Sequence, residues 1–402
     1  MRLQKNYVVL LLTLGVMITG LIPKAFSASL NIVVLTSTQN EQKNVGKSFA
    51  GITTKPVRNI ERASKLALIE SSDIFKLFGI DATLDRIDIA DSSDAGVKLA
   101  NLPKSSLILL DIPKSLFLSV AKKATELELI TVNVRHPEQE FRHKICSTYL
   151  FHTIPSHQMY FDALAQFLIH KGWRKVLVIR GPSEDDELRS KSLVKSLKKF
   201  GTSVQEERVY SLSHHPDDRD KNRPDFLTGG VSYDVVAIID SASDYGRYFQ
   251  YNSRRPRPIV GDVGLIPRGW HYALERYGAP QLNGRYRDFL PGQLSELDGM
   301  TDTEFAAWTA IKYITNSLHL IPEASDSIDV KEIYSLPDGA VDLYKGTRGS
   351  FRAWNHQLRQ PMLLTTTSAV IAVAPMPKFL HPTHYADTLG IDAPESKCRL
   401  DQ

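Results

Sequence analysis

Two kinds of hydrophobic pattern alternate along most of the chain. Short aliphatic runs at 107–110, 176–179 and 235–239 are typical of strands that are covered on both faces in a parallel sheet. Between these runs, apolar residues recur at i, i+3, i+4 and i+7, which is the spacing of an amphipathic helix. The alternation predicts an α/β fold with parallel sheets, in which right-handed crossovers connect successive strands.

A break near the middle of the chain divides this pattern into two series. The segment 146–182 contains Pro155, which has no backbone N–H to donate, and then Ser156, a favoured helix N-cap. The helical stretch that follows ends at Gly172, and a new strand begins near 176. Because 402 residues exceed one ordinary domain core, we expect two lobes.

Residues 1–27 have the pattern of a cleaved secretory signal peptide. Arg2 and Lys5 precede an uncharged apolar run at 7–22, and small residues follow that run. An uncleaved membrane anchor is the alternative, but the run is short for a membrane span. Cleavage removes three basic residues and no acid, so the formal charge falls from +4 to +1. A chain with so little basic excess is not expected to bind nucleic acid.

The sequence contains two cysteines, Cys146 and Cys398. In an exported chain an even pair predicts a disulfide, and two unpaired thiols are the alternative. The bond would tie the C-terminal tail to the break between the two series. In the loop-entropy model so long a loop stabilises the folded protein by about 5 kcal/mol.

No catalytic motif stands out. The sequence lacks the Gly-x-Ser-x-Gly, His-Glu-x-x-His and Gly-x-Gly-x-x-Gly patterns, and residues 46–48 match only the end of a phosphate-binding loop. A hydrolase would need a converging set such as Ser156 with His152 or His157. We therefore expect a binding protein rather than an enzyme, with no cofactor and no metal.

Several segments resemble a known family. The chain is similar to type I periplasmic binding proteins of the branched-chain amino acid transport class, and most of all to the ABC-transporter substrate-binding proteins associated with pyrroloquinoline-quinone-dependent alcohol oxidation. The resemblance runs from about residue 107 to the tail, and residues 69–78 depart from the family's Asn-rich turn. The matching segments are FHTIPS (151–156), DALAQ (162–166), YDV (233–235), RPRPIVG (255–261), GLIP (264–267) with Trp270 and His271, SFRAWNHQLRQP (350–361), 379–381, 387–390 and PESKC (394–398).

The resemblance implies a type I periplasmic binding fold, in which two Rossmann-like lobes are joined by three crossovers. The crossovers are expected near 151–156, 260–265 and 344–350. The implied division is 28–151 with 265–345 for lobe 1, 152–264 with 346–374 for lobe 2, and a tail at 375–402 tethered to lobe 1.

A ligand is expected in the cleft between these lobes. Open α/β sheets bind ligands outside the carboxyl ends of their strands. The candidate ligand-binding residues are Asp111, Ser115, Asn133, Arg135, Ser156, Gly181, Ser183, Asp240, Ser243 and Asp262. Each can instead cap local backbone. If the ligand carries an amine, Asp240 or Asp262 is its natural partner, because a buried cation needs a charge-assisted hydrogen bond.

By resemblance, the chain is expected to be a monomeric periplasmic protein that closes on a small organic solute. It would present this solute to an ABC permease in the inner membrane, in connection with quinoprotein-dependent alcohol catabolism. A ligand-sensing subunit of a membrane receptor is one alternative, and a secreted α/β hydrolase is another. Fold alone does not separate these functions.

Overall fold

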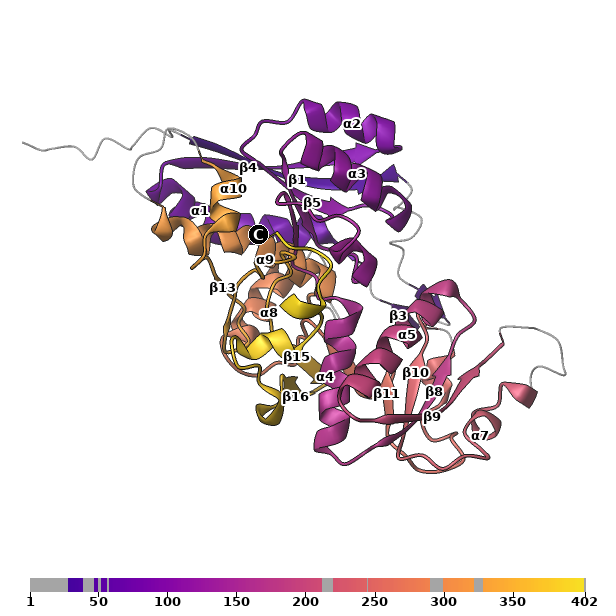
Figure 1. Cartoon of the computed structure of the whole chain (residues 1–402). Helices are drawn as coiled ribbons and strands as arrows, with labels where there is room; N and C mark the ends of the chain where they lie inside the picture. Colours follow the sequence, from indigo (N-terminus) through magenta and orange to yellow (C-terminus); the bar gives the residue numbers. More distant parts are fainter. Residues whose placement is uncertain are drawn as a thin grey trace, which may run out of the picture.

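The computed structural model of the chain describes residues 28–38, 47–49, 52–55, 58–211, 220–243, 245–289, 299–321 and 328–400. The predicted signal peptide lies outside these ranges. The described chain forms two lobes, each built around its own parallel sheet (Figure 1). The α/β architecture predicted from the hydrophobic pattern is therefore confirmed.

Lobe 1 is organised around a five-stranded parallel sheet of order β4-β1-β5-β6-β7. Its middle strand is buried on both faces: Leu107 and Leu109 pack toward α1 and α9, whereas Ile108 and Leu110 pack toward α2 and α3. The strands are β1 (Ala28–Ser37), β4 (Ile80–Ile89), β5 (Ser106–Asp111), β6 (Ile130–Asn133) and β7 (Leu150–His152). The helices are α1 (Ile60–Leu77), α2 (Ser92–Ala100), α3 (Lys114–Glu126), η2 (Gln139–Arg142), α8 (Ala279–Asp288), α9 (Asp302–Ser317), η4 (Leu318–Leu320) and α10 (Val330–Ser335).

Lobe 2 contains a four-stranded parallel sheet of order β11-β10-β8-β9. Two long helices, α4 and α5, cover one face, and the short α7 with neighbouring loops covers the other. The strands are β8 (Lys175–Arg180), β9 (Ser203–Val209), β10 (Val235–Ile239) and β11 (Ile259–Gly261). The helices are α4 (His157–His170), α5 (Glu184–Lys199), α7 (Pro224–Leu227) and η3 (Gly246–Tyr248).

The predicted break in the chain is the start of α4. Ser156 Oγ accepts a hydrogen bond from the backbone N–H of Met159, as expected of an N-cap. Gly172 follows the helix with φ of 75°, a left-handed conformation that favours glycine. Local sequence signals therefore set both ends of the helix that opens lobe 2.

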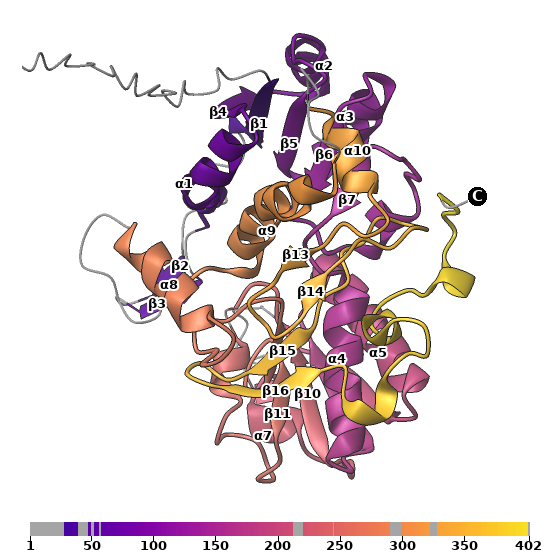
Figure 2. The same cartoon turned by 90° about the vertical axis from the view of Figure 1, so that its left-hand side faces the viewer.

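A small antiparallel sheet lies between the two lobes (Figure 2). Its middle strand contributes to both cores, because Met362 and Leu364 belong to the core of lobe 2 and Leu363 belongs to that of lobe 1. The sheet, here called the hinge sheet, consists of β12 (Ile266–Arg268), β15 (Met362–Thr365) and β16 (Val370–Ala374). Two further hairpins are β2 (Lys47–Phe49) with β3 (Ile52–Lys55), and β13 (Val341–Asp342) with β14 (Arg348–Gly349).

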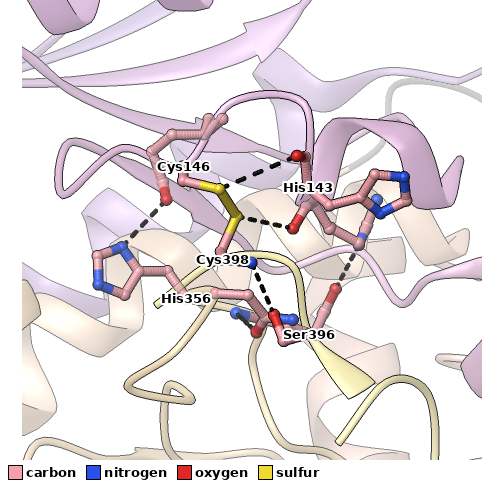
Figure 3. The surroundings of a disulfide bond; sticks show 9 residues. His143, Cys146, His356, Ser396 and Cys398 are labelled. Atoms are coloured by element: carbon pink, nitrogen blue, oxygen red, sulfur yellow. Dashed lines mark hydrogen bonds between the residues drawn. A yellow bond between two sulfur atoms is a disulfide. The ribbon is translucent and has the colours of Figure 1, made fainter. Parts of the chain in front are cut away.

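The C-terminal tail contacts both lobes. On the lobe 2 side, Asp162 of α4 accepts a hydrogen bond from the backbone N–H of Gly390 at 2.8 Å. Three short helical turns lie along this tail: η5 (Pro377–Phe379), η6 (Tyr385–Thr388) and η7 (Ala393–Glu395). On the lobe 1 side, Cys398 forms the predicted disulfide with Cys146, which follows η2 (Figure 3). The tail is thus tethered to lobe 1 while most of it packs on lobe 2.

Within the described ranges, no helix combines the length and the apolar character that crossing a bilayer requires.

Candidate functional site

A cavity of about 440 Å³ lies between the lobes, and residues of both lobes line it. Lobe 1 contributes 135–138 and 301–303, and lobe 2 contributes the starts of α4 and α5 and the ends of β10 and β11. The hinge sheet contributes β12. A volume of this size suits a small organic molecule.

A larger hollow of about 730 Å³ lies between α2 and α3 on the outer side of lobe 1. Small residues such as Gly96 and Ala100 line it together with Lys122 and Lys123. Only one lobe contributes to this hollow, so hinge closure cannot enclose a ligand there. The inter-lobe cavity is therefore the candidate site.

Four of the ten predicted site residues line the cavity: Arg135, Asp240, Ser243 and Asp262. They come from both lobes, because Arg135 follows β6 and the other three follow β10 and β11. A fifth residue, Asp111, lies behind Arg135 and accepts a hydrogen bond from its Nη1 at 2.7 Å. Burial raises the pKa of Asp111, although the guanidinium of Arg135 opposes that shift.

Asp240 uses both carboxylate oxygens in contacts within its own lobe. Its Oδ1 accepts a hydrogen bond from the Tyr210 hydroxyl at 3.0 Å. Its Oδ2 accepts hydrogen bonds from the backbone N–H groups of Tyr245 and Gly246 at 2.9 and 2.7 Å. This geometry corresponds to the local capping that was the alternative to pairing with a ligand amine.

Asp262 is likewise engaged within lobe 2. Both of its oxygens accept hydrogen bonds from the guanidinium of Arg189, and Oδ2 also accepts from the backbone N–H of Asp240 at 2.7 Å. The Arg189 side chain is 17% exposed and that of Asp262 is 18% exposed, so the pair is largely desolvated. Neither Asp240 nor Asp262 offers an unoccupied carboxylate to a ligand.

The other five predicted residues do not line the cavity. Asn133 is buried, and its Oδ1 accepts hydrogen bonds from two backbone N–H groups in the loop after β6. Ser156 and Ser183 are the N-caps of α4 and α5. Ser115 is exposed on α3, and Gly181 allows close approach, since a Cβ there would lie 2.8 Å from the Tyr210 hydroxyl.

The sequence did not single out several side chains that line the cavity. They are Arg58, His136, Glu138, Tyr160, Asp185, Arg189, Arg268, Thr301, Asp302 and Thr303, and His157 had been named only for the hydrolase alternative. For two of them a signal existed, because His136 and Glu138 come directly after the strand end at Asn133. Asp185 and Arg189 lie in the first turns of α5.

Several titratable groups that line the cavity have perturbed pKa values, among them Glu138, Asp185 and His157. Burial opposes ionisation of Glu138, yet the neighbouring His136 lowers the pKa of that carboxyl to about 2. Burial raises the pKa of Asp185. Burial and the charge of Arg189 lower the pKa of His157 to about 3, so the imidazole is neutral at physiological pH. Its buried Nε2 has no hydrogen-bond partner among the described residues.

The residues of the hydrolase alternative do not form a catalytic set. Ser156 is 2% exposed, and its hydroxyl oxygen caps α4. The ring of His152 hydrogen-bonds with Asn133 Nδ2 at 3.1 Å. Within the described part of the chain, neither His152 nor His157 hydrogen-bonds with Ser156, so this serine has no general base.

Comparison with known proteins supports the fold. No protein-family model matches the chain, and no curated protein sequence matches it. A branched-chain amino acid ABC transporter periplasmic ligand-binding protein from Burkholderia xenovorans aligns with a TM-score of 0.68 and 11% identity, covering 93% of this chain and 100% of the other. An ABC transporter substrate-binding protein from Sphaerobacter thermophilus aligns with a TM-score of 0.65 and 15% identity, and the alignment covers 86% of this chain and 98% of the other.

A third similar structure is the solute-binding protein of an ABC transporter from R. palustris in complex with benzoate. It has a TM-score of 0.61 and 12% identity, and the alignment covers 92% of this chain and 99% of the other. These neighbours are solute-binding proteins rather than enzymes. The chain therefore has the fold of type I periplasmic binding proteins, as its sequence predicted.

Proposed function

We propose that this chain is the periplasmic substrate-binding component of an ABC-type transporter, and that it closes its two lobes around a small organic solute. The observation that carries the proposal is the inter-lobe cavity, to which both lobes contribute polar side chains. A ligand that contacts both lobes binds the closed form more tightly than the open form, so it shifts the equilibrium toward closure. Structural neighbours that bind leucine or benzoate show that this fold holds such solutes.

Closure requires that the crossovers bend while the contacts at their ends are kept. Arg142 makes contacts of this kind. Its guanidinium is 2% exposed and donates to the Gln357 side-chain oxygen at 2.6 Å and to the Ile154 carbonyl at 2.8 Å. It also donates to the carbonyls of His136 and Glu138, both at 2.9 Å. Arg142 thus joins a loop of lobe 1 to the crossover at 151–156 and to Gln357, which follows the crossover at 344–350.

The wider biological setting is part of the same proposal. The resemblance of the block 350–361 leads us to propose a link to quinoprotein-dependent alcohol oxidation. The proposed division is 28–151 with 265–345 and 152–264 with 346–374, in a monomer exported by the signal peptide at 1–27. A strain that lacks the gene should lose uptake of the solute or growth on the corresponding alcohols. Normal growth and uptake would contradict this link without affecting the binding proposal.

A thermal-shift screen of the protein from residue 28 onward tests the binding proposal. Amino acids, alcohols, aldehydes and carboxylates are screened, and a compound that binds only the folded state raises the melting temperature. Small-angle scattering with each such compound should show a smaller radius of gyration. The matched control is Val97→Lys in the hollow between α2 and α3, which should not change either response. Product formation that Ser156→Ala abolishes, without compaction, would favour the hydrolase.

A further inference from the structure

Two arginines in the cleft have no acidic partner. Arg58 precedes α1 in lobe 1 and Arg268 ends β12 of the hinge sheet, and both line the cavity. Among the described residues, neither guanidinium makes a hydrogen bond or a salt bridge. The other two cavity arginines, Arg135 and Arg189, are each paired with an aspartate of their own lobe. The cavity therefore contains two guanidinium groups that have no hydrogen-bonded counter-ion among the described residues.

Asp302, one of three carboxylates whose charge acts on Arg58, is already hydrogen-bonded elsewhere. Asp302 Oδ1 accepts a hydrogen bond from the backbone N–H of Trp270 at 2.9 Å, and Oδ2 accepts from the Tyr160 hydroxyl at 2.7 Å. Burial is the main cause that lowers the pKa of Arg58, and the charge of Arg135 adds to it, whereas the carboxylates of Asp111, Asp302 and Glu304 oppose the shift without cancelling it. An anion bound in the cavity beside Arg58 would favour the charged guanidinium further.

The acids elsewhere in the cavity do not supply the missing charge. Glu138 lies 3.6 Å from the His136 ring and 3.9 Å from the Lys114 ammonium. Asp185 belongs to lobe 2 at the start of α5, and burial favours its protonated form. Neither Glu138 nor Asp185 forms an ion pair with Arg58 or Arg268 in the part of the chain that the structure describes.

We propose that Arg58 and Arg268 bind the acid group of the solute, so the ligand is an organic anion such as a carboxylate. This inference rests on the proposed function and names the chemistry of its ligand. A guanidinium presents parallel N–H donors that match the two oxygens of a carboxylate. The rest of the cavity suits an apolar body, because Ile154, Phe161 and Ile266 line it.

Both lobes take part in this recognition. The acid group contacts lobe 1 and the hinge sheet through the two arginines. On the side of lobe 2, Ser241, Ser243 and the neutral Nε2 of His157 offer uncharged polar contacts. An anion held by the arginines therefore needs closure to complete its contacts, which couples charge recognition to the motion.

Matched compound sets test the inference. Three carbon skeletons, a benzene ring, an isobutyl group and a pentyl group, are each tested as the carboxylate, the primary amide, the primary alcohol and the amine. Thermal shift at constant ionic strength is followed by calorimetry for compounds that stabilise the protein. We expect only the carboxylate of a set to bind. Its Kd should weaken at least about tenfold in Arg58→Gln and in Arg268→Gln, because each removes a charge-assisted hydrogen bond.

The control variants separate binding from folding. Arg257→Gln changes an exposed arginine outside the cavity and should leave the Kd unchanged. Since neither Arg58 nor Arg268 hydrogen-bonds with a carboxylate among the described residues, their replacement breaks no such pair, and the melting temperature without ligand should stay the same. Arg135→Gln provides the contrast, because it leaves Asp111 without its guanidinium and should lower that temperature.

Each outcome bears on one of the two proposals. Binding by an amine or an alcohol but not by its carboxylate overturns the anion inference, and compaction with that compound still supports solute binding. Carboxylate binding that neither substitution weakens also overturns it. Arginine-dependent carboxylate binding without compaction supports the anion inference and contradicts closure.

If no organic compound in the sets binds, sodium sulfate at fixed ionic strength becomes the probe. A sulfate-induced rise in melting temperature that is lost in Arg58→Gln and Arg268→Gln but kept in Arg257→Gln supports the anion site. An equal sulfate response in all four proteins overturns it.

Discussion

Removal of the disulfide tests how the C-terminal tail contributes to stability. The bond joins Cys146 and Cys398 across a sequence separation of 252, with Cα atoms 5.3 Å apart. In the loop-entropy model, a loop of this length stabilises the folded protein by about 5 kcal/mol. For a chain of 402 residues the entropy of unfolding is about 0.8 kcal/mol/K. The variant C146S/C398S should therefore melt about 6 °C below the wild type.

Most of the tail should stay folded without the disulfide. Arg352 is 1% exposed, and its guanidinium donates to the Asp387 carboxylate at 2.9 Å and to the main-chain carbonyls of residues 386, 389 and 391. Asp162 of α4 accepts from the backbone N–H of Gly390. These contacts do not depend on the sulfur atoms, so the bond secures mainly the segment after residue 391.

Calorimetry and hydrogen exchange separate these two effects. The oxidised wild type, the wild type in dithiothreitol and C146S/C398S are compared, and the latter two should melt alike. Amides in 376–391 should keep their protection, and amides in 396–400 should lose it. A difference in melting temperature below about 1 °C would refute the loop-entropy argument. Loss of protection throughout 376–391 would refute the role of Arg352.

Three further perturbations test the cleft wall, the hinge and the buried histidines. Asp262→Asn leaves Arg189 without its carboxylate, so the free energy of unfolding in urea should fall by about 3 kcal/mol, and no change would contradict the pairing. Arg142→Met removes four hydrogen bonds and should lower the free energy of unfolding in urea by about 3 kcal/mol. A decrease below about 1 kcal/mol would count against the hinge role of Arg142. Burial lowers the pKa values of His157 and His271 to about 3 and about 4, whereas both protonate near pH 6.5 when unfolded. The contribution of each neutral histidine to the free energy of unfolding is therefore fully present above pH 6.5. It should fall by up to about 1.4 kcal/mol per histidine per pH unit between pH 6.5 and 4. His271→Gln should reduce the slope of the free energy of unfolding against pH in that range.

The positions of many helices and strands follow from local sequence chemistry. The start of α4 depends on Ser156, whose hydroxyl oxygen reaches a backbone N–H three residues away. The strand at 235–239 was predicted from its aliphatic run, and the structure buries all of its residues. Capping and hydrophobic periodicity act over a few residues, so they can be recognised without knowledge of the rest of the chain.

The composition of the cleft depends on contacts between distant residues. Arg135 pairs with an aspartate 24 positions away, and Arg189 pairs with one 73 positions away. The order of strands in each sheet creates these pairs, and among the described residues it leaves Arg58 and Arg268 as the cavity arginines without a hydrogen bond or an ion pair. Those two come from the segment before α1 and from the hinge sheet, whose places are set by the packing of the lobes. A guanidinium has the same sequence signature whether it is paired or free, so its availability to a ligand emerges only once the chain is folded.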